Sequence, residues 1–397
     1  MIAVGLTAPR WLSSVARADV LRQSKGAKVG NTVLVVCDLR GGNDGLNTIV
    51  PFKDPLYRTM RPTLGIAEDK LLKSASAPDI GFHPSLTGVQ TLFNEGKVAI
   101  IQNAGYPKPN RSHFKSMEIW QSASPESNMK YGWIGRHFDG QSATGPLNPV
   151  VAVGLSTDKP LALSGKTASI PCFASLTDIQ SMVGDPDAER MLRQIQGMDA
   201  MEGSGTRVVQ QASKAALDAM ALLSKQLSNY APKESYGTDP FGQGFKQISQ
   251  LVATSPATRV VYFSVGGFDT HARQAETHER LLKNFGDGVL AFQREMESVG
   301  KADNVLVLVF SEFGRRSYEN ASGGTDHGAA APMFLIGKNV KGGLHGPVPN
   351  LSDLSDGDLK YGIDFREVYA TTLDKWLGGD SGVVLGQKFN HVGVLAT

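Results

Sequence analysis

Acidic, basic and histidine side chains follow four separate apolar runs in this 397-residue chain, each group coming directly after its run ends. In chain order, the groups are Asp38, Arg40 and Asp44; Arg111, Ser112 and His113; Asp269 and His271; and Glu312, Arg315, Arg316, Asp326 and His327. Ligands of open α/β sheets bind at the edge where the parallel strands end. We therefore expect the four groups to meet at one site.

The residue types of these groups are those that bind a divalent cation. Carboxylate oxygens and neutral imidazole nitrogens are common ligands of such ions. Asp269 and His271 are two residues apart, so an extended segment would turn both side chains the same way. Glu312 follows a buried strand, where an unpaired carboxylate is costly to keep ionised. The sequence predicts a metal site with the candidate ligands Asp38, Asp44, Asp269, His271, Glu312, Asp326 and His327.

The Gly-rich stretch from Ser311 to Pro332 carries the largest of the four groups. A loop that only turns needs Gly, Asn or Ser, whereas this one also contains an acid, two arginines and an Asp-His pair. We expect it to form one wall of the metal site. The alternative is that it is an ordinary polar loop between two strands.

The elements that must position these residues can be read from apolar periodicity. Six β-branched apolar runs span Asn31–Asp38, Lys97–Asn103, Asn148–Gly154, Thr258–Val265, Asn304–Phe310 and Ala331–Gly337. Continuous apolarity is typical of strands covered on both faces, as in a parallel sheet. Helical patterns separate several runs, one with Pro84 at its start and one with Leu281, Phe285 and Val289 at helical spacing. The pattern predicts a three-layer α/β/α domain with a mainly parallel sheet.

Two further helical regions are predicted. The segment around residues 185–230 is rich in Met and Ala and has no strand signal, which indicates a helical insertion. Near the C-terminus, Asp364 is expected to be the N-cap of a helix that stops at Gly378.

Composition limits the partners of the protein. Hydrophobic residues make up 41% and charged residues 20% of the chain, and the net charge is +2, so nothing indicates a nucleic-acid partner. The longest apolar runs are about six residues, too short for a membrane span. The cysteines are Cys37 and Cys172, and a disulfide between them stays open at this stage. No G-x-S-x-G elbow is present, which argues against an ordinary serine hydrolase.

Residues 1–18 have a short apolar piece followed by small residues at Ala16–Ala18, which is typical of the end of a secretory signal. We interpret this segment as the remnant of an export signal and residues 19–397 as one domain. The alternative is an ordinary N-terminal helix.

Five motifs in order carry a resemblance to a known family. "LRGGNDGLNTIVP", "NRSHF", "GGFDTH", "FSEFGR" and "GTDHG" together resemble the exported bacterial family known as domain of unknown function 1501. That family is placed in the alkaline-phosphatase-like superfamily, with sulfatases and phosphodiesterases. The resemblance runs from about Val29 to the C-terminus. It implies an alkaline-phosphatase-like domain and twin-arginine export, and hence a periplasmic or secreted protein.

The resemblance also implies roles for residues of this chain. Asp38, or alternatively Asp44, corresponds to the acid after the first strand, and Ser112 to a nucleophile at a helix N-terminus, where N–H groups hold an oxyanion. Asp269, His271 and His327 correspond to metal ligands. Glu312 and Phe313 correspond to an Asp-His pair that holds a second metal. Phe cannot bind a metal, so this chain departs from the superfamily pattern there.

The expected function is a metal-dependent, exported hydrolase of phosphate or sulfate esters. Ser112 is the candidate nucleophile beside His113, and Arg40 or Arg315 would bind the anionic small-molecule or polymer ester. One or two divalent ions are expected, with zinc, manganese, magnesium and calcium as candidates. The alternative is a non-catalytic metal-binding envelope protein that acts in assembly or polymer secretion.

Overall fold

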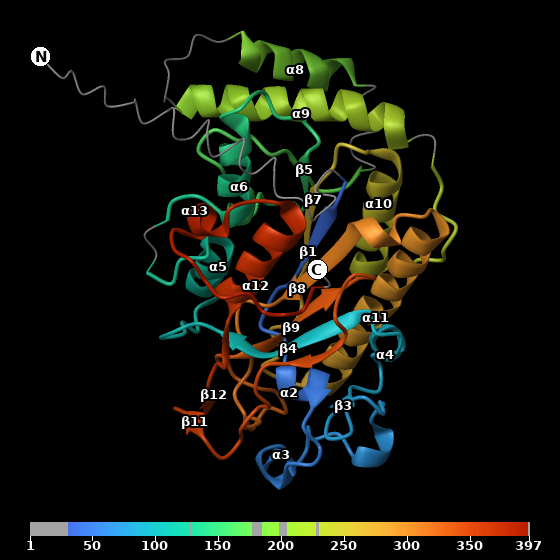
Figure 1. Cartoon of the computed structure of the whole chain (residues 1–397), viewed down its shortest axis with the longest axis vertical. Coiled ribbons are helices and arrows are strands. Elements are labelled where there is room, and N and C mark those ends of the chain that lie inside the picture. Colours follow the sequence, from blue (N-terminus) through green and yellow to red (C-terminus); the bar gives the residue numbers. More distant parts are fainter. Residues whose placement is uncertain (1–30, 127–128, 177–184, 198–204, 228–229, 396–397) are drawn as a thin grey trace, which may run out of the picture.

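A computed structural model describes residues 31–126, 129–176, 185–197, 205–227 and 230–395. Within these ranges nine strands form one sheet, with β13 beside β4 and the others in the order β10-β4-β9-β8-β1-β7-β5-β6 (Figure 1). The strands are β1 (Val33–Leu39), β4 (Val98–Gly105), β5 (Ala152–Leu155), β6 (Cys172–Phe173), β7 (Val260–Val265), β8 (Val305–Phe310), β9 (Ala331–Ile336), β10 (Gly343–His345) and β13 (Ile363–Asp364). The export-signal interpretation of residues 1–18 lies outside the described residues.

Strand direction brings the predicted groups to one edge. Strands β1, β7 and β8 are mutually parallel, and β9 is antiparallel to both β8 and β4. Two reversals leave β4 parallel to β8, so β1, β4, β7 and β8 all end at the same edge, and β9 begins there. The predicted α/β fold with a mainly parallel sheet is confirmed. Continuous apolarity indicates that a strand is buried on both faces, but it does not indicate the direction in which the strand runs. The sequence therefore could not show that β9 is antiparallel to its neighbours.

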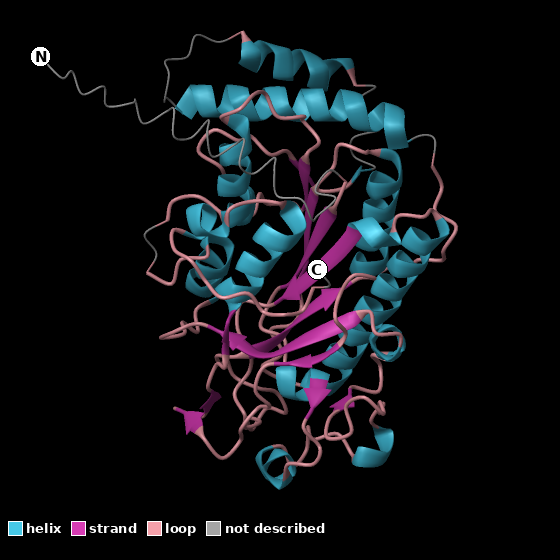
Figure 2. Ribbon diagram, viewed as in Figure 1, coloured by secondary structure: helices cyan, strands magenta, loops and turns pink. Residues whose placement is uncertain are grey.

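Helices cover both faces of the sheet (Figure 2). One core contains Val35 and Cys37 of β1, and the other contains Leu34 and Val36, because successive side chains of a strand point to opposite faces. The first face is covered by α4 (Thr87–Asn94), α10 (Pro240–Thr254) and α11 (Gln274–Ser298), and the second by α5 (His113–Ser122), α6 (Trp133–Ser142), α12 (Phe365–Thr372) and α13 (Ser381–Leu385). The three layers match the prediction.

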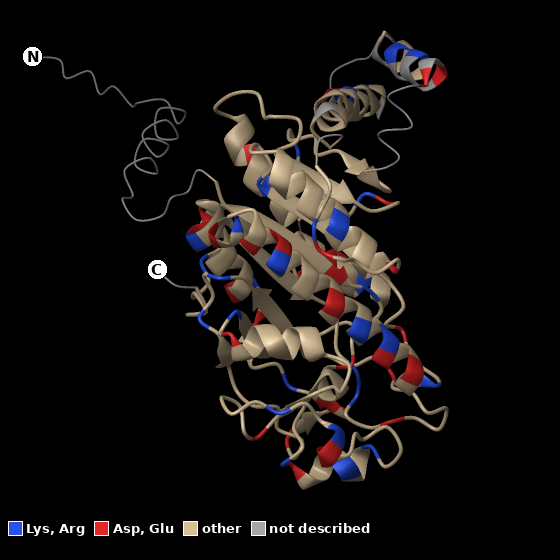
Figure 3. Cartoon of the chain, turned by 90° about the vertical axis from the view of Figure 1, so that its right-hand side faces the viewer, with Lys and Arg blue, Asp and Glu red and all other residues tan. Residues whose placement is uncertain are grey.

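Helix α11 shows why its sequence forms a surface helix. Its buried side includes Leu281, Phe285 and Val289, which pack on the sheet. Charged residues recur along the same helix (Figure 3), and the exposed side chains of Lys283 and Asp287 form an ion pair. The apolar stripe has the width expected of a helix that packs on one face.

The helices α8 (Pro186–Gln196) and α9 (Gly205–Leu227) lie at the end of the molecule opposite to α2 (Gly45–Thr48), which follows β1 (Figure 1). In α9, Ala219, Met220 and Leu223 are buried in the core under the sheet. Lys214 of α9 borders a cavity with Val151, at the beginning of β5. These helices are therefore remote from the edge at which the strands end.

Three smaller expectations have clear outcomes. Asp364 caps α12, with its carboxylate accepting from Arg366 N–H, and Gly378 adopts the left-handed conformation that ends the following turn, as predicted. The helix expected to begin at Pro84 begins instead at Thr87. The reason is a turn in which the ring of His83 accepts from Ser85 N–H.

The two cysteines are free thiols. Strands β7 and β5 lie between β1, which carries Cys37, and β6, which carries Cys172. Three strand spacings separate them by about 14 Å, well beyond the reach of a disulfide. None of the helices in the described part of the chain combines the length and apolarity that crossing a bilayer requires.

Close packing of α4 on α11 gives a test of the fold. A Cβ added at Gly88 would lie 2.1 Å from the carbonyl oxygen of Gly286, a backbone atom that cannot move aside easily. Gly88→Ala is therefore expected to lower the free energy of unfolding by about 1–3 kcal/mol. Gly140→Ala is the matched control, because Gly140 lies in α6 with no atom within 4 Å of the added Cβ. It should raise the stability by up to about 1 kcal/mol.

Urea unfolding of both variants checks this expectation. Equal destabilisation by the two substitutions would show that the close approach of the helices is not the cause.

Candidate metal centre

A buried guanidinium joins the loops that follow β1, β7 and β8. The side chain of Arg315 is 0% exposed. Its Nε donates to the carbonyl of Gly42 at 2.7 Å and its Nη1 to that of Thr325 at 2.7 Å, and its Nη2 donates to the carbonyls of Gly41 and Phe268. Four hydrogen bonds of one side chain thus fix three loops relative to one another.

Arg315 also donates from Nη2 to Asp269 Oδ1 at 2.7 Å. The prediction that Arg315 binds an anionic ester does not fit this geometry, because the guanidinium is buried and engaged with the protein. Arg315 instead holds the carboxylate of Asp269 in place.

Glu312 is buried in the same frame. Its carboxylate accepts from the N–H groups of Gly41 at 2.9 Å and Gly42 at 3.2 Å, and from Ser311 Oγ at 3.1 Å. Both glycines have positive φ, 118° and 83°, and a Cβ at Gly41 would lie 2.3 Å from Asp269 N, so only glycine fits there. Glu312 also accepts from His113 Nδ1 at 2.9 Å. The carboxylate predicted to be a metal ligand therefore orients a histidine.

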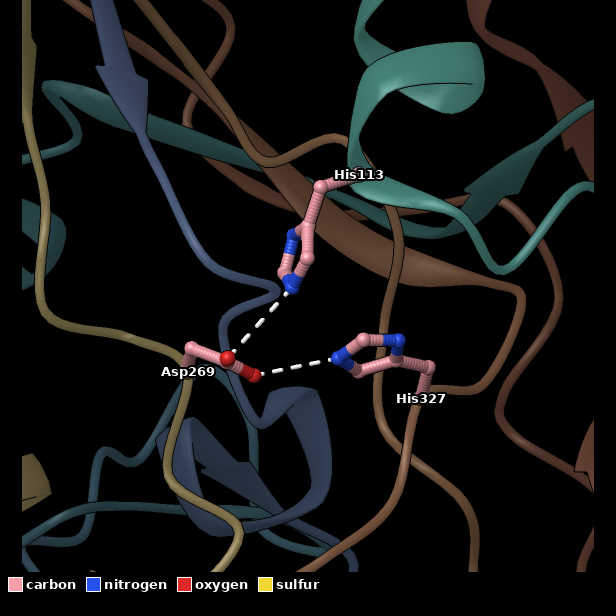
Figure 4. Close-up of side chains that lie close together, drawn as sticks. All are labelled: His113, Asp269 and His327. Atoms are coloured by element: carbon pink, nitrogen blue, oxygen red, sulfur yellow. Dashed lines mark hydrogen bonds and ion pairs between the residues drawn. The ribbon is translucent and has the colours of Figure 1, made fainter.

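Three side chains from different loops converge at the strand ends (Figure 4). Asp269 follows β7, His113 begins α5 after β4, and His327 precedes β9. Asp269 Oδ1 lies 3.0 Å from His327 Nε2, and Asp269 Oδ2 lies 3.4 Å from His113 Nε2. One ligand atom from each of the three lies within 4.8 Å of the others, a spacing that a single cation can bridge.

In each of these histidines, Nδ1 faces away from Asp269 and has its own hydrogen-bond partner. That partner determines which ring nitrogen carries the proton. His327 Nδ1 lies 2.8 Å from the carbonyl oxygen of Arg111, which can only accept, so Nδ1 is the protonated nitrogen. Burial lowers the pKa of His327, so the ring is neutral and its Nε2 carries a lone pair. In its neutral form His113 donates from Nδ1 to Glu312 and likewise presents a bare Nε2, although that hydrogen bond raises the pKa of His113.

His271 adds a third imidazole with the same arrangement. Its Nδ1 lies 3.2 Å from Asp326 Oδ1, and its Nε2 lies 3.0 Å from Asp269 Oδ1 and 2.9 Å from His327 Nε2. Asp326 also accepts from Asn320 Nδ2, so it orients His271 rather than facing the centre. Lone pairs of two imidazoles and a carboxylate face one another here, which is unfavourable without a positive charge between them. The donor set therefore fits a bound cation.

Phe313 lies beside the imidazoles. Its ring centroid is 4.5 Å from that of His327 and 5.0 Å from that of His113, and the side chain is buried. The residue that cannot bind a metal thus packs on two candidate ligands and restricts their ring planes.

Asp38 lies beside the cluster and not within it. The carboxylate is fully buried and accepts from Tyr262 OH at 2.8 Å and from Arg40 Nε at 3.2 Å. Its Oδ1 has no hydrogen-bond partner among the described residues. Burial raises the pKa of Asp38 to about 7, with Arg40 opposing this shift and Glu312 adding to it. The side chain of Arg40 remains 33% exposed, so it can still reach a solute.

Asp44 is not brought to the cluster. Its carboxylate pairs with the buried guanidinium of Arg61 and accepts from Gln274 Nε2. Burial raises the pKa of Asp44, but Arg61, together with its other polar neighbours, outweighs burial, and the pKa lies below the ordinary value. Asp44 was predicted to be a metal ligand because its partner Arg61 was not recognised in the sequence. In the structure it belongs to this ion pair.

Ser112 is the N-cap of α5 and is exposed. Its N–H donates to Asn110 Oδ1 at 2.9 Å, and its hydroxyl makes no capping hydrogen bond. His113 was expected to be a catalytic residue beside Ser112, and its place among the candidate metal ligands was not predicted. The sequence did contain an indication of this role. His113 is the first residue of a helix, and that helix follows a strand that ends at the site.

A family model supports the identity of the chain. The model of the family described as "Protein of unknown function (DUF1501)" matches residues 31–387. No match was found among curated proteins.

Several solved structures are similar to the chain at low identity. Ps i-CgsB, solved in complex with k-i-k-neocarrahexaose, has 9% identity and a TM-score of 0.41, covering 91% of this chain and 73% of its own. The sulfatase PsFucS1 from Pseudoalteromonas sp. has 10% identity and a TM-score of 0.39, covering 98% and 75%. The alkaline phosphatase of the Antarctic bacterium TAB5 has 11% identity and a TM-score of 0.31, covering 77% and 92%. Because their TM-scores are below 0.5, these similarities carry no argument about function, which must be inferred from the geometry of the site.

Removal of the buried guanidinium should destabilise the fold strongly. Arg315→Met leaves Asp269 without its cation and several buried carbonyls without donors, so the free energy of unfolding should fall by about 3–5 kcal/mol. Arg316→Met is the control, because Arg316 is 34% exposed and its ion pairs are longer, and it should cost less than about 1 kcal/mol. Urea unfolding with a chelator present measures both without a contribution from bound metal. Similar losses for the two variants would contradict the role given to Arg315.

The buried ring of His278 gives a pH dependence. Its Nε2 lies 2.9 Å from Asn43 Oδ1, and burial lowers its pKa to about 3. The unfolded chain takes up the proton near pH 6.5 and the folded chain does not, so wild-type stability falls as the pH drops below 6.5.

His278→Gln keeps a donor at the position of Nε2 and removes this titration. The stability advantage of wild type over the variant should therefore shrink by about 1.4 kcal/mol between pH 7.5 and pH 5.5. Urea unfolding at both pH values measures it, and an advantage that is the same at both would contradict the assignment.

Proposed function

The chain belongs to the DUF1501 family of proteins of unknown function, and we propose that it is a metal-dependent, exported hydrolase of phosphate or sulfate esters. The observation that carries the proposal is the set of imidazole nitrogens of His113, His271 and His327 that converge on the carboxylate of Asp269. Such a set holds a cation, and it lies at the edge where the strands of the sheet end. The five sequence motifs resemble the DUF1501 family, and the placement of that family in the alkaline-phosphatase-like superfamily supports the same reaction class.

We propose that Asp269, His113 and His327 are ligands of one divalent ion, with His271 as a fourth. A set of nitrogens with one carboxylate suits zinc or manganese, whereas calcium and magnesium prefer oxygen ligands. When bound, the ion supplies positive charge that stabilises the charge developing on the oxygens of the ester. A second ion would have to use Asp38 Oδ1, which has no partner among the described residues.

The side chains around the ion have distinct proposed roles. Ser112 is the nucleophile or a group that positions water, since it stands at the start of α5, where N–H groups without partners in the helix attract an oxyanion. Arg40 binds the ester anion with the exposed part of its guanidinium. Glu312 and Arg315 orient His113 and Asp269 and do not contact the substrate.

Exposure of the cluster indicates the size of the substrate. The side chains of Asp269 and His271 are 46% and 44% exposed, and that of His113 is 35% exposed. Sites for small molecules bury most of the ligand surface. An open cluster of this kind suits an ester group carried by a polymer better than a small ester enclosed on all sides. The resemblance to an exported family supports a protein that acts outside the cytoplasm.

A second function is favoured by one observation. Among the described hydrogen bonds, none joins the hydroxyl of Ser112 to the cluster. A chain that keeps the ion without the chemistry would be a non-catalytic metal-binding envelope protein, acting in assembly or polymer secretion.

Metal content is the direct test of the proposed site. Protein purified without chelators should contain zinc or manganese, and His113→Asn, Asp269→Asn and His327→Asn should each weaken binding more than about 100-fold, the upper limit for changes outside the ligand set. His345→Asn is the control, because His345 lies on β10 and its ring forms a hydrogen bond with the carbonyl of Lys341. Calorimetric titration of the metal-free proteins measures the affinities. A wild-type protein that binds none of the four ions would refute the site.

Hydrolysis of aryl phosphate and aryl sulfate esters by the metal-loaded protein separates the two functions. Ser112→Ala should abolish turnover and leave the metal affinity unchanged. Metal binding without turnover of either ester would favour the envelope protein.

A further inference from the structure

A short hairpin far from the cluster in sequence lies against the loops that carry it. The strands β11 (Leu354–Ser355) and β12 (Asp358–Leu359) are antiparallel and are joined by Asp356 and Gly357. Both joining residues have positive φ, 53° and 79°, as the tight two-residue turn with the twist of a hairpin requires. This turn places two carboxylates, Asp356 and Asp358, on the same end of the hairpin.

Both carboxylates bind Arg111, but in different environments. Asp358 Oδ2 accepts from Arg111 Nε at 2.9 Å and from Nη2 at 2.6 Å, and the side chain of Asp358 is 3% exposed. Asp356 Oδ2 accepts from Arg111 Nη2 at 2.9 Å, and its side chain is 77% exposed. Solvent and salt screen the exposed pair, so the shielded pair with Asp358 determines where Arg111 lies.

The backbone of Arg111 reaches the metal centre. Its carbonyl oxygen accepts from Nδ1 of His327 at 2.8 Å. A proton held on Nδ1 leaves Nε2 of the same ring unprotonated, and Nε2 is the atom that faces Asp269. If the carbonyl moved away, the proton could transfer to Nε2 and that atom could no longer bind a metal. The position of one carbonyl oxygen therefore favours the tautomer in which His327 can be a ligand.

The hairpin also touches the loop that contains His327. Arg316 lies 3.5 Å from Asp356 Oδ2 and 3.9 Å from Asp358 Oδ1, and its N–H donates to the carbonyl of Asp326 at 3.0 Å. The end of the hairpin thus contacts Arg111 directly and, through Arg316, the loop that contains His327.

We propose that Asp358 is a positioning residue of the metal centre, which holds Arg111 so that its carbonyl keeps His327 in the tautomer with a free Nε2. The proposal rests on the proposed function in one respect, that the cluster binds a divalent ion. It assigns to β11–β12 a role that neither its distance in sequence nor its exposed turn indicates.

Zinc affinity of paired variants tests the proposal. Asp358→Asn removes the charge that holds Arg111 and should weaken zinc binding about 10–100-fold, as loss of an outer partner of a ligating histidine does. Asp356→Asn removes the exposed carboxylate from the same guanidinium and should change the affinity by less than about threefold. Equal affinities of the two variants would overturn the proposal.

Arg111→Met gives a second route that does not alter the hairpin. It keeps the carbonyl of Arg111 but frees it from Asp358, and should weaken zinc binding as much as Asp358→Asn. The double variant should bind no more weakly than either single variant, because both act through one hydrogen bond. Additive losses would show that Asp358 acts otherwise than through Arg111, and would overturn the proposal even if Asp358→Asn folds poorly.

The tautomer of His327 can be observed without metal. Nitrogen-15 shifts of the ring in the metal-free protein should report a proton on Nδ1 in wild type and a mixture of tautomers in Asp358→Asn. An unchanged tautomer in the variant would overturn the proposal. If the wild-type protein bound no metal, the proposed function would fail, while these shifts would still decide whether Asp358 sets the tautomer.

Discussion

The guanidinium of Arg315 is the interaction on which the rest of the site depends. It is buried among the ends of three strands, and its donors bond to carbonyls of Gly41, Gly42, Phe268 and Thr325 and to the carboxylate of Asp269. A buried cation is tolerated only where its donors are satisfied, so the loops cannot move apart without leaving it unpaired. The same loops supply the N–H groups that bind Glu312. One ion pair therefore sets both the shape of the loops and the orientation of a candidate ligand.

The antiparallel direction of β9 explains why the loop between β8 and β9 contributes several residues to the site. Because β9 runs antiparallel to β8, the chain leaves β8 and enters β9 at the same edge, and the whole of residues 311–330 stays over that edge. A helical crossover would have been needed if β9 were parallel, and it would have carried the segment away from the site. Glu312, Arg315 and His327 can act on the same few ångströms of space because of this reversal.

The sequence predicted those features that local pattern determines. Apolar runs located the strands of the central sheet, and their common edge located the groups that carry chemistry. Pattern could not show which charges pair with which. Asp44 is bound by Arg61, and Arg315 is buried rather than free, because each finds its partner through tertiary contacts between residues distant in sequence. His113 was recognised as part of the site, but its orientation depends on Glu312, 199 residues away.

The three imidazoles share one design with different outer partners. Nδ1 of His113 is held by the buried carboxylate of Glu312, that of His271 by the carboxylate of Asp326, whose side chain is 57% exposed, and that of His327 by a neutral carbonyl. A carboxylate partner makes the ring more basic than a carbonyl partner does, and more so where it is shielded from water. In agreement with this, the hydrogen bond to Glu312 raises the pKa of His113, whereas burial lowers the pKa of His327. With Nε2 of His113 bound to the ion and Nδ1 carrying the proton donated to Glu312, this ring has no free lone pair, so the proton of Ser112 must pass to another group if that hydroxyl attacks an ester.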